Sequence, residues 1–171
     1  MSSPAEQGAP PARSAAQRGR ANRRRGHDSE RALARWLRSN GFGQAERAVR
    51  TGFRTADRAA PDPGDITGTP GIVWSVKDCA AEQTTKWLAE LEVMRAGAGA
   101  LVGLLVHRRR GYADPGRWWC WTPLDVPVWL LTGYGGAAGH AEARAPVRME
   151  LTDVVALLRA TGYGDPPEAT P

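Results

Sequence analysis

The chain has 171 residues, a length that suits one domain with a buried core. No apolar run approaches the roughly 20 residues that cross a bilayer, and nothing at the N-terminus resembles a secretory signal. Its two cysteines, Cys79 and Cys120, cannot build a disulfide framework and lack the paired spacing of zinc ligands. These features exclude a membrane-spanning or disulfide-stabilised protein, and we expect a cytoplasmic one.

The net charge of +5 is concentrated at the N-terminus. Residues 1–27 hold six of the 23 basic residues and one of the 18 acids, so residues 28–171 have 17 of each. Because this Pro-, Ala-, Gly- and Arg-rich segment has almost no apolar residues to offset its ordering entropy, we expect a disordered basic arm. Such an arm suits the phosphates of DNA; a solvated terminus without a partner is the alternative.

A helix is predicted for residues 28–40, where apolar side chains recur at helical spacing behind Asp28 or Ser29 as the N-cap, and Gly41 closes it. The other elements follow from apolar alternation, continuous apolar runs and turn residues. In chain order they are a strand within 44–50, a polar loop at 51–63, strands at 64–68 and 72–77, a helix at 82–96, a buried strand at 100–107, a strand at 117–121, a short helix or turn at 123–131, a Gly- and Ala-rich linker at 132–145, a strand at 146–149 and a helix at 151–160.

This order predicts one α/β domain with a mixed central β-sheet flanked by helices. We divide the chain into a disordered basic arm at 1–27, a core domain at 28–131, a C-terminal extension with a strand and a helix at 132–164, and a disordered tail at 165–171.

An acid, a hydroxyl and an ammonium group are expected to converge on one small patch, because the turn at residues 69–71 folds two strands alongside each other. Asp65 and Lys77 lie on the two strands that this turn joins, and strand alternation puts Ser75 on the same face as Lys77. Arginine supplies 21 of the 23 basic residues, so a lysine at the end of an apolar run indicates a need for a compact point charge. The alternative is a structural ion pair across a hairpin.

Four short motifs in this order resemble the PD-(D/E)xK nuclease superfamily, and within it the Holliday-junction-resolvase-like proteins of actinobacteria and their phages. They are Glu30 in the first helix, Gly-Asp-Ile at 64–66, Trp-Ser-Val-Lys at 74–77 and Gln83 at the start of the next helix. The resemblance spans about residues 26–125. It implies a restriction-endonuclease-like fold, hydrolysis of phosphodiester bonds in branched DNA with Mg²⁺ or alternatively Mn²⁺, and a homodimer, because paired cuts on a symmetric junction need two active sites.

The resemblance also implies a role for each matching residue. Asp65 would be the principal Mg²⁺ ligand, joined by the backbone carbonyl of Val76. Lys77 would position or help to deprotonate the attacking water. Glu30 would hold a ligand water or a second ion. Gln83 would contact a phosphate or the lysine, although an ordinary exposed glutamine in a first helical turn is an equal alternative.

Ser75 departs from the family, which has Glu or Asp two residues before the lysine. A neutral hydroxyl binds Mg²⁺ far less well than a carboxylate. Three interpretations remain open. The acid has moved to the following helix, where Glu82, Glu90 and Glu92 are candidates and Glu90, one turn after Trp87, is the one we include among the metal ligands. Alternatively, the remaining ligands suffice for weak activity, or cleavage is lost and DNA binding kept.

Basic and aromatic residues elsewhere fit a DNA-binding surface. The tryptophans at 118, 119 and 121 are predicted to lie in the core or a dimer interface, with base stacking the less favoured role. Asp78 is expected to cap or turn the chain after the strand. The arginines expected to line a DNA channel are Arg23, Arg24, Arg25, Arg50, Arg54, Arg108, Arg109 and Arg110.

The preferred function is therefore a metal-dependent, structure-selective DNA endonuclease. The alternative is a catalytically silent DNA-binding protein of the same fold. A third is a protein-interaction module whose arginine-rich arm binds an acidic partner other than DNA.

Overall fold

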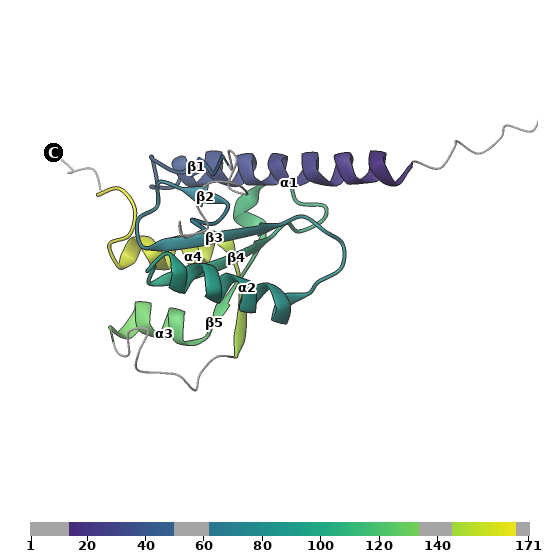
Figure 1. Cartoon of the computed structure of the whole chain (residues 1–171). Coiled ribbons are helices and arrows are strands. Elements are labelled where there is room, and N and C mark those ends of the chain that lie inside the picture. Colours follow the sequence, from purple (N-terminus) through teal and green to yellow (C-terminus); the bar gives the residue numbers. More distant parts are fainter. Residues whose placement is uncertain (1–13, 50–61, 134–144, 167–171) are drawn as a thin grey trace, which may run out of the picture.

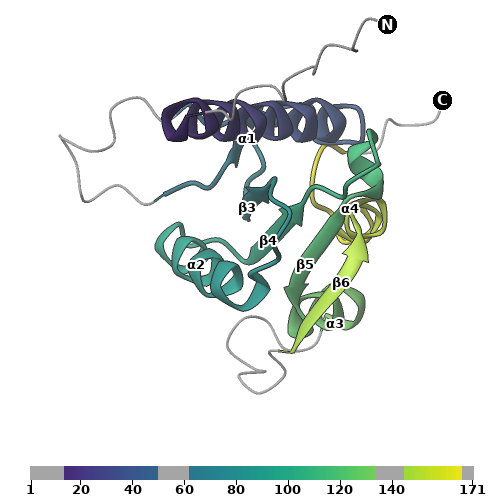
Figure 2. The same cartoon turned by 90° about the vertical axis from the view of Figure 1, so that its right-hand side faces the viewer.

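A mixed β-sheet lies at the centre of the fold, with helices on both of its faces (Figures 1 and 2). The computed structural model describes residues 14–49, 62–133 and 145–166. Within these ranges the elements are α1 (Ala15–Arg38), β1 (Glu46–Arg47), β2 (Ile66–Thr67), β3 (Ile72–Lys77), α2 (Thr84–Gly97), β4 (Val102–His107), the 3₁₀ turn η1 (Pro115–Arg117), β5 (Trp119–Pro123), α3 (Asp125–Thr132), β6 (Pro146–Glu150) and α4 (Leu151–Ala160).

The sheet has the order β1-β2-β3-β4-β5-β6, so each strand pairs with its neighbours in sequence. Only β3 and β4 run parallel, and the other four pairs are antiparallel. The parallel pair needs a crossover, which α2 supplies. The prediction of an α/β fold with a mixed sheet flanked by helices is confirmed, and β3 and α4 begin and end at the predicted residues.

Two hydrophobic clusters cover opposite faces of the sheet. Because side chains alternate along β3, Trp74 joins the larger cluster with Leu33 of α1, whereas Val73 packs with Trp87 and Leu91 of α2. Helix α4 contributes to the larger cluster as well. Figure 2 shows α1 and α2 on either side of the β3–β4 pair. The C-terminal end of β3 therefore lies between two helices.

Helix α1 begins at Ala15, well before the predicted start at residues 28–29. The expectation of a disordered arm is therefore wrong for residues 14–27, while residues 1–13 lie outside the described ranges. Ser14 and Gln17 form a reciprocal capping box. The segment is rich in Ala and Arg, which favour helix, and it continues a helix whose other half is packed around Leu33. Figure 1 shows this N-terminal half projecting beyond the sheet.

The C-terminal tail is also ordered further than expected. The Asp165 carboxylate accepts a hydrogen bond of 2.6 Å from the N–H of Gly43, and its own N–H donates to the carbonyl of Gly41 at 2.8 Å. The predicted disorder is thus wrong at residue 165, and residues 167–171 lie outside the described ranges. Most of the predicted loop at 51–63 and most of the predicted linker at 132–145 also lie outside the described ranges. Among the described helices, none is long and apolar enough to cross a membrane.

Candidate active site between α1, β3 and α2

A pocket of about 320 Å³ opens beside the C-terminal half of β3, between α1 and α2. Its lining is mostly polar and includes acids from three parts of the chain. The described residues that line it are Glu30, Asp62, Asp65, Ser75, Val76, Lys77, Glu90 and Met94. The acid, hydroxyl and ammonium groups that the sequence placed together on one patch therefore share one cavity.

Asp65 is held against β3 by two hydrogen bonds to the backbone of that strand, one through its own N–H and one through its carboxylate. Its N–H donates to the carbonyl of Trp74 at 2.8 Å, and its Oδ2 accepts from the N–H of Val76 at 2.7 Å. Gly64 makes this close approach possible: its φ is +84°, and a Cβ there would meet the Trp74 carbonyl oxygen at 2.5 Å. Gly64 and Asp65 together thus fix the Asp65 carboxylate beside Ser75 and Lys77.

Lys77 faces an acid on the next helix. Its Nζ lies 3.7 Å from Oε2 of Glu90, and Nζ of Lys86 lies 3.9 Å from the other oxygen of the same carboxylate. The other two candidate acids are engaged elsewhere. Glu82 lies 3.5 Å from His107, and Glu92 forms a two-pronged ion pair with Arg95. Of the three glutamates, Glu90 is the one that lines the pocket.

Ser75 lies at the base of the pocket, where only 1% of the residue is exposed. Glu30 reaches the pocket from α1 and pairs with Arg47 of β1, its Oε2 lying 3.2 Å from Nη1. Gln83 is exposed at the N-cap position of α2 and does not line the cavity. The geometry therefore brings together Glu30, Ser75 and Glu90 with the Asp65–Lys77 pair and leaves Gln83 outside.

The donor atoms of the pocket suit a hard divalent cation, because they are carboxylate and hydroxyl oxygens. In the described part of the chain, no three His, Cys, Asp or Glu side chains are grouped closely enough to hold an ion. Glu30 and Glu90 each turn toward a cationic side chain, Arg47 and Lys77 respectively. Both glutamates nevertheless line the cavity.

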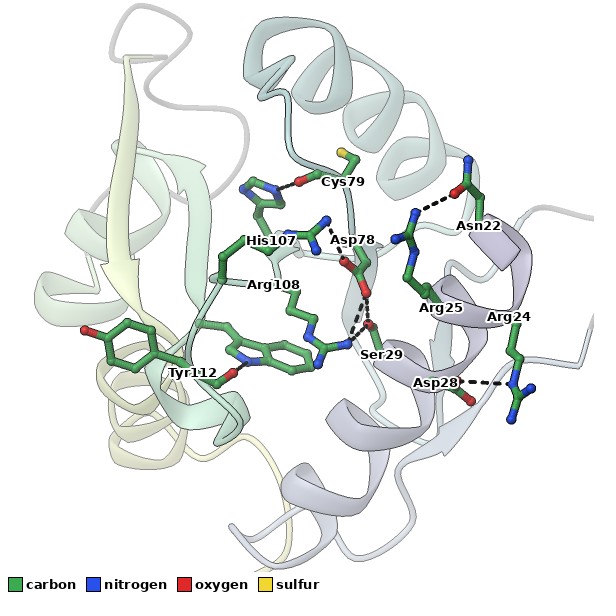
Figure 3. A network of polar contacts seen from close by, with 12 residues as sticks. Asn22, Arg24, Arg25, Asp28, Ser29, Asp78, Cys79, His107, Arg108 and Tyr112 are labelled. Carbon is green, nitrogen blue, oxygen red and sulfur yellow. Dashed lines mark hydrogen bonds and ion pairs between the residues drawn. The ribbon is translucent and has the colours of Figure 1, made fainter. Parts of the chain in front are cut away.

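A second polar cluster, which the sequence did not reveal, ties α1 to the end of β3 (Figure 3). The Asp78 side chain is 2% exposed and accepts a hydrogen bond of 2.8 Å from the Ser29 hydroxyl. Nη1 of Arg108 and Nη2 of Arg110 lie 3.1 and 3.6 Å from the Asp78 carboxylate. Because Ser29 precedes Glu30 and Asp78 follows Lys77, this cluster sits directly behind the pocket.

The arginines predicted to bind DNA occupy different settings. Those at 23, 24 and 25 lie exposed on α1, and those at 50 and 54 fall outside the described residues. Arg108 and Arg110 are engaged by Asp78. Arg109 pairs with Glu150 at 3.2 Å and stacks between two aromatic rings. The DNA channel therefore stays a prediction, and the three arginines that follow β4 each have an acidic partner.

Neither cysteine is set up as a nucleophile. Complete burial raises the pKa of the Cys120 thiol far above its ordinary value. Burial also raises the pKa of the Cys79 thiol, and the charge of Asp78 adds to that rise. Since the thiolate is the reactive form, both thiols are poor nucleophiles near neutral pH.

No protein-family model, curated protein or solved structure matches this chain.

Proposed function

We propose that the protein is a metal-dependent DNA endonuclease with a restriction-endonuclease-like fold, similar in action to Holliday junction resolvases and active as a homodimer. One observation carries the proposal: Glu30, Asp65, Ser75, Lys77 and Glu90, from separate parts of the chain, line one pocket. Phosphodiester hydrolysis needs oxygen ligands for a divalent cation and a positive group near the phosphate. This pocket has both.

We assign a separate role to each group of residues in the pocket. Asp65 and Glu90 would hold Mg²⁺ or Mn²⁺, which when bound activates water and neutralises charge on the phosphate. Lys77 would orient the attacking water and stabilise negative charge on the phosphate oxygens. The Glu90 carboxylate now faces the Lys77 ammonium, so its turn toward the cavity would release that ammonium for the substrate.

The pocket favours one of the three interpretations of Ser75. A carboxylate that is missing from position 75 of β3 is supplied within the same cavity by α2, through Glu90. A migrated acid would therefore account for the departure from the pattern that the chain resembles and would keep a carboxylate available for catalysis.

A second candidate is a DNA-binding protein of the same fold that does not cut. It is favoured by the pairing of Glu30 with Arg47 and of Glu90 with Lys77, together with the lack of a ready three-ligand cluster among the described residues. In this case the pocket acids would serve as ion-pair partners, and binding would depend on the surface arginines alone.

The test is a cleavage assay on four-way junctions and linear duplexes with Mg²⁺, Mn²⁺ or EDTA. We expect metal-dependent cutting that Asp65→Ala, Lys77→Ala and Glu90→Gln each lower by about 100-fold or more. Glu92→Gln is the matched control, because it removes a neighbouring carboxylate that lies outside the pocket. Salt-sensitive binding of the junction without cutting would establish the silent candidate, and no DNA binding at all would refute both.

Ser75→Glu separates the interpretations of the missing acid. If Glu90 has taken over, a second carboxylate at this 1%-exposed position adds like-charge repulsion, and activity falls. A sharp gain in activity would instead show that the native site is a degraded one.

A further inference from the structure

The face of the sheet that carries Ser75 and Lys77 continues into a stack of aromatic rings and arginines on β5 and β6. Residues that pair directly across neighbouring strands point to the same face. The register places Ser75, Leu105, Trp121 and Arg148 in one row across four strands. The next row is Lys77, His107, Trp119 and Glu150.

In this stack, rings and guanidinium groups alternate. The Arg109 guanidinium carbon lies 3.9 Å from the ring centroid of Tyr112 and 4.1 Å from that of Trp119. On the other side, the Arg148 guanidinium lies 4.5 Å from Trp119 and 5.3 Å from Trp121. We call these five residues the Arg–aromatic stack.

The stack is a surface feature rather than core. Trp118 is buried, whereas its neighbours Trp119 and Trp121 are partly buried and Arg148 is exposed. Trp121 packs at the edge of the α2 cluster, whereas Trp119 belongs to neither of the two hydrophobic clusters of described residues. A large indole that contributes to no core cluster and lies between two cations is unusual for a purely structural residue.

The charge of the stack is positive. Around the Arg–aromatic stack, Glu150 pairs with Arg109 at 3.2 Å and with Arg117 at 2.7 Å. Arg148 lies over the Trp119 ring, so among the described residues at the stack three arginines accompany one carboxylate. A partner that offers negative charge together with flat π-faces is an unpaired nucleotide, whose phosphate meets the arginines while its base stacks on a ring.

We propose that the Arg–aromatic stack binds unpaired nucleotides of the DNA substrate. The inference rests on the proposed function and narrows its substrate class to DNA with a single-stranded segment beside the cleavage point. Trp119 lies two strands from Lys77, roughly 10 Å at the usual strand spacing. About three nucleotides at 3.4 Å each would cover that distance.

The test measures binding without cleavage. The full-length protein is titrated in EDTA with a fluorescent 15-nucleotide single strand and with a 15-base-pair duplex, for wild type, Trp119→Leu, Arg148→Gln and the matched charge control Arg35→Gln. We expect both stack variants to weaken single-strand binding at least about fivefold and to change duplex binding less than twofold. Arg35→Gln should change both affinities by the same small factor.

Several results would overturn the inference. The first is that both variants bind the single strand as tightly as wild type does, while their thermal melts match that of wild type. The second is that the wild-type protein does not bind the single strand, whether or not it cuts duplex DNA. If sedimentation shows that Trp119→Leu converts a dimer to a monomer with DNA affinity unchanged, the stack is an interface between two copies. Loss of cutting in Lys77→Ala with binding intact would leave the stack standing, so the two proposals fail separately.

Discussion

Removal of the Asp78 carboxylate is predicted to loosen α1 from the end of β3. This carboxylate is 2% exposed and receives hydrogen bonds from Ser29 of α1 and from Arg108 after β4, with Arg110 beside it (Figure 3). It is therefore the group on which three segments of the chain converge. Asp78→Ala deletes the centre of the cluster, and Arg110→Ala deletes its most exposed member.

The size of the effect follows from the exposure of each partner. The Arg108 bond is charge-assisted and partly buried, and such bonds contribute about 2 kcal/mol. Ser29 is fully buried, so its hydroxyl loses a partner it cannot replace with water, at about 1 kcal/mol. Asp78→Ala should thus cost about 3 kcal/mol. The Arg110 side chain is 59% exposed, and its loss should cost about 0.5 kcal/mol.

Urea denaturation at pH 7, followed by tryptophan fluorescence, measures both values, and hydrogen exchange locates the effect. We expect faster exchange of the amides of α1 around Ser29 in Asp78→Ala and unchanged exchange in α4. A loss below 1 kcal/mol, or equal losses for Asp78→Ala and Arg110→Ala, would refute the assignment of Asp78 as the anchor of α1.

Three further predictions concern the helix cap, a tight turn and the thiols. Ser14→Ala should remove about 1 kcal/mol from the first turns of α1, seen as faster amide exchange there and nowhere else. Gly68→Ala should destabilise the protein far more than Gly99→Ala in thermal melts, because both have positive φ but a Cβ at Gly68 collides with backbone while Gly99 faces open space; equal costs would contradict this. An alkylating reagent should modify Cys79 slowly, and faster as pH rises, since its raised pKa keeps the thiol protonated at neutral pH. Cys120 should react only after unfolding, and mass spectrometry that finds it modified in the native protein would contradict its burial.

The sequence predicted well where burial is periodic or continuous. The runs in β3 and β4 are apolar because both faces are covered, and the stripe of α4 repeats at helical spacing. The sequence-based prediction was wrong at the start of α1, because the exposed residues there show no apolar periodicity. There the helix depends on a cap at Ser14 and on propagation from a packed half that lies more than a dozen residues away.

In the pocket, too, local relations could be predicted from the sequence and long-range ones could not. Asp65, Ser75 and Lys77 could be grouped in advance, because a hairpin and strand alternation fix their relations locally. Glu90 is preferred to Glu82 and Glu92 because it lies one turn after Trp87, but the sequence could not fix its direction, which depends on how α2 is rotated over the sheet. That rotation is set by the burial of Trp87 and Leu91 against Val73 and Leu105. The Asp78 cluster joins residues up to 79 apart in sequence, as in the Ser29–Arg108 contact, and had no local signal.

A carboxylate on a helix differs physically from one at position 75 of a strand. At 1% exposure, an acid at Ser75 would have to stay ionised in a nearly dry position, which is costly without a bound cation. Glu90 is 47% exposed in its side chain and rests against Lys77 and Lys86, so its charge is solvated and balanced when the pocket holds no metal. If Glu90 takes the place of a strand acid as a metal ligand, as we propose, the exchange removes an electrostatic strain from the unliganded protein. A metal bound by Glu90 would then have to displace a lysine contact, so we expect weaker metal affinity and a higher metal concentration for half-maximal activity.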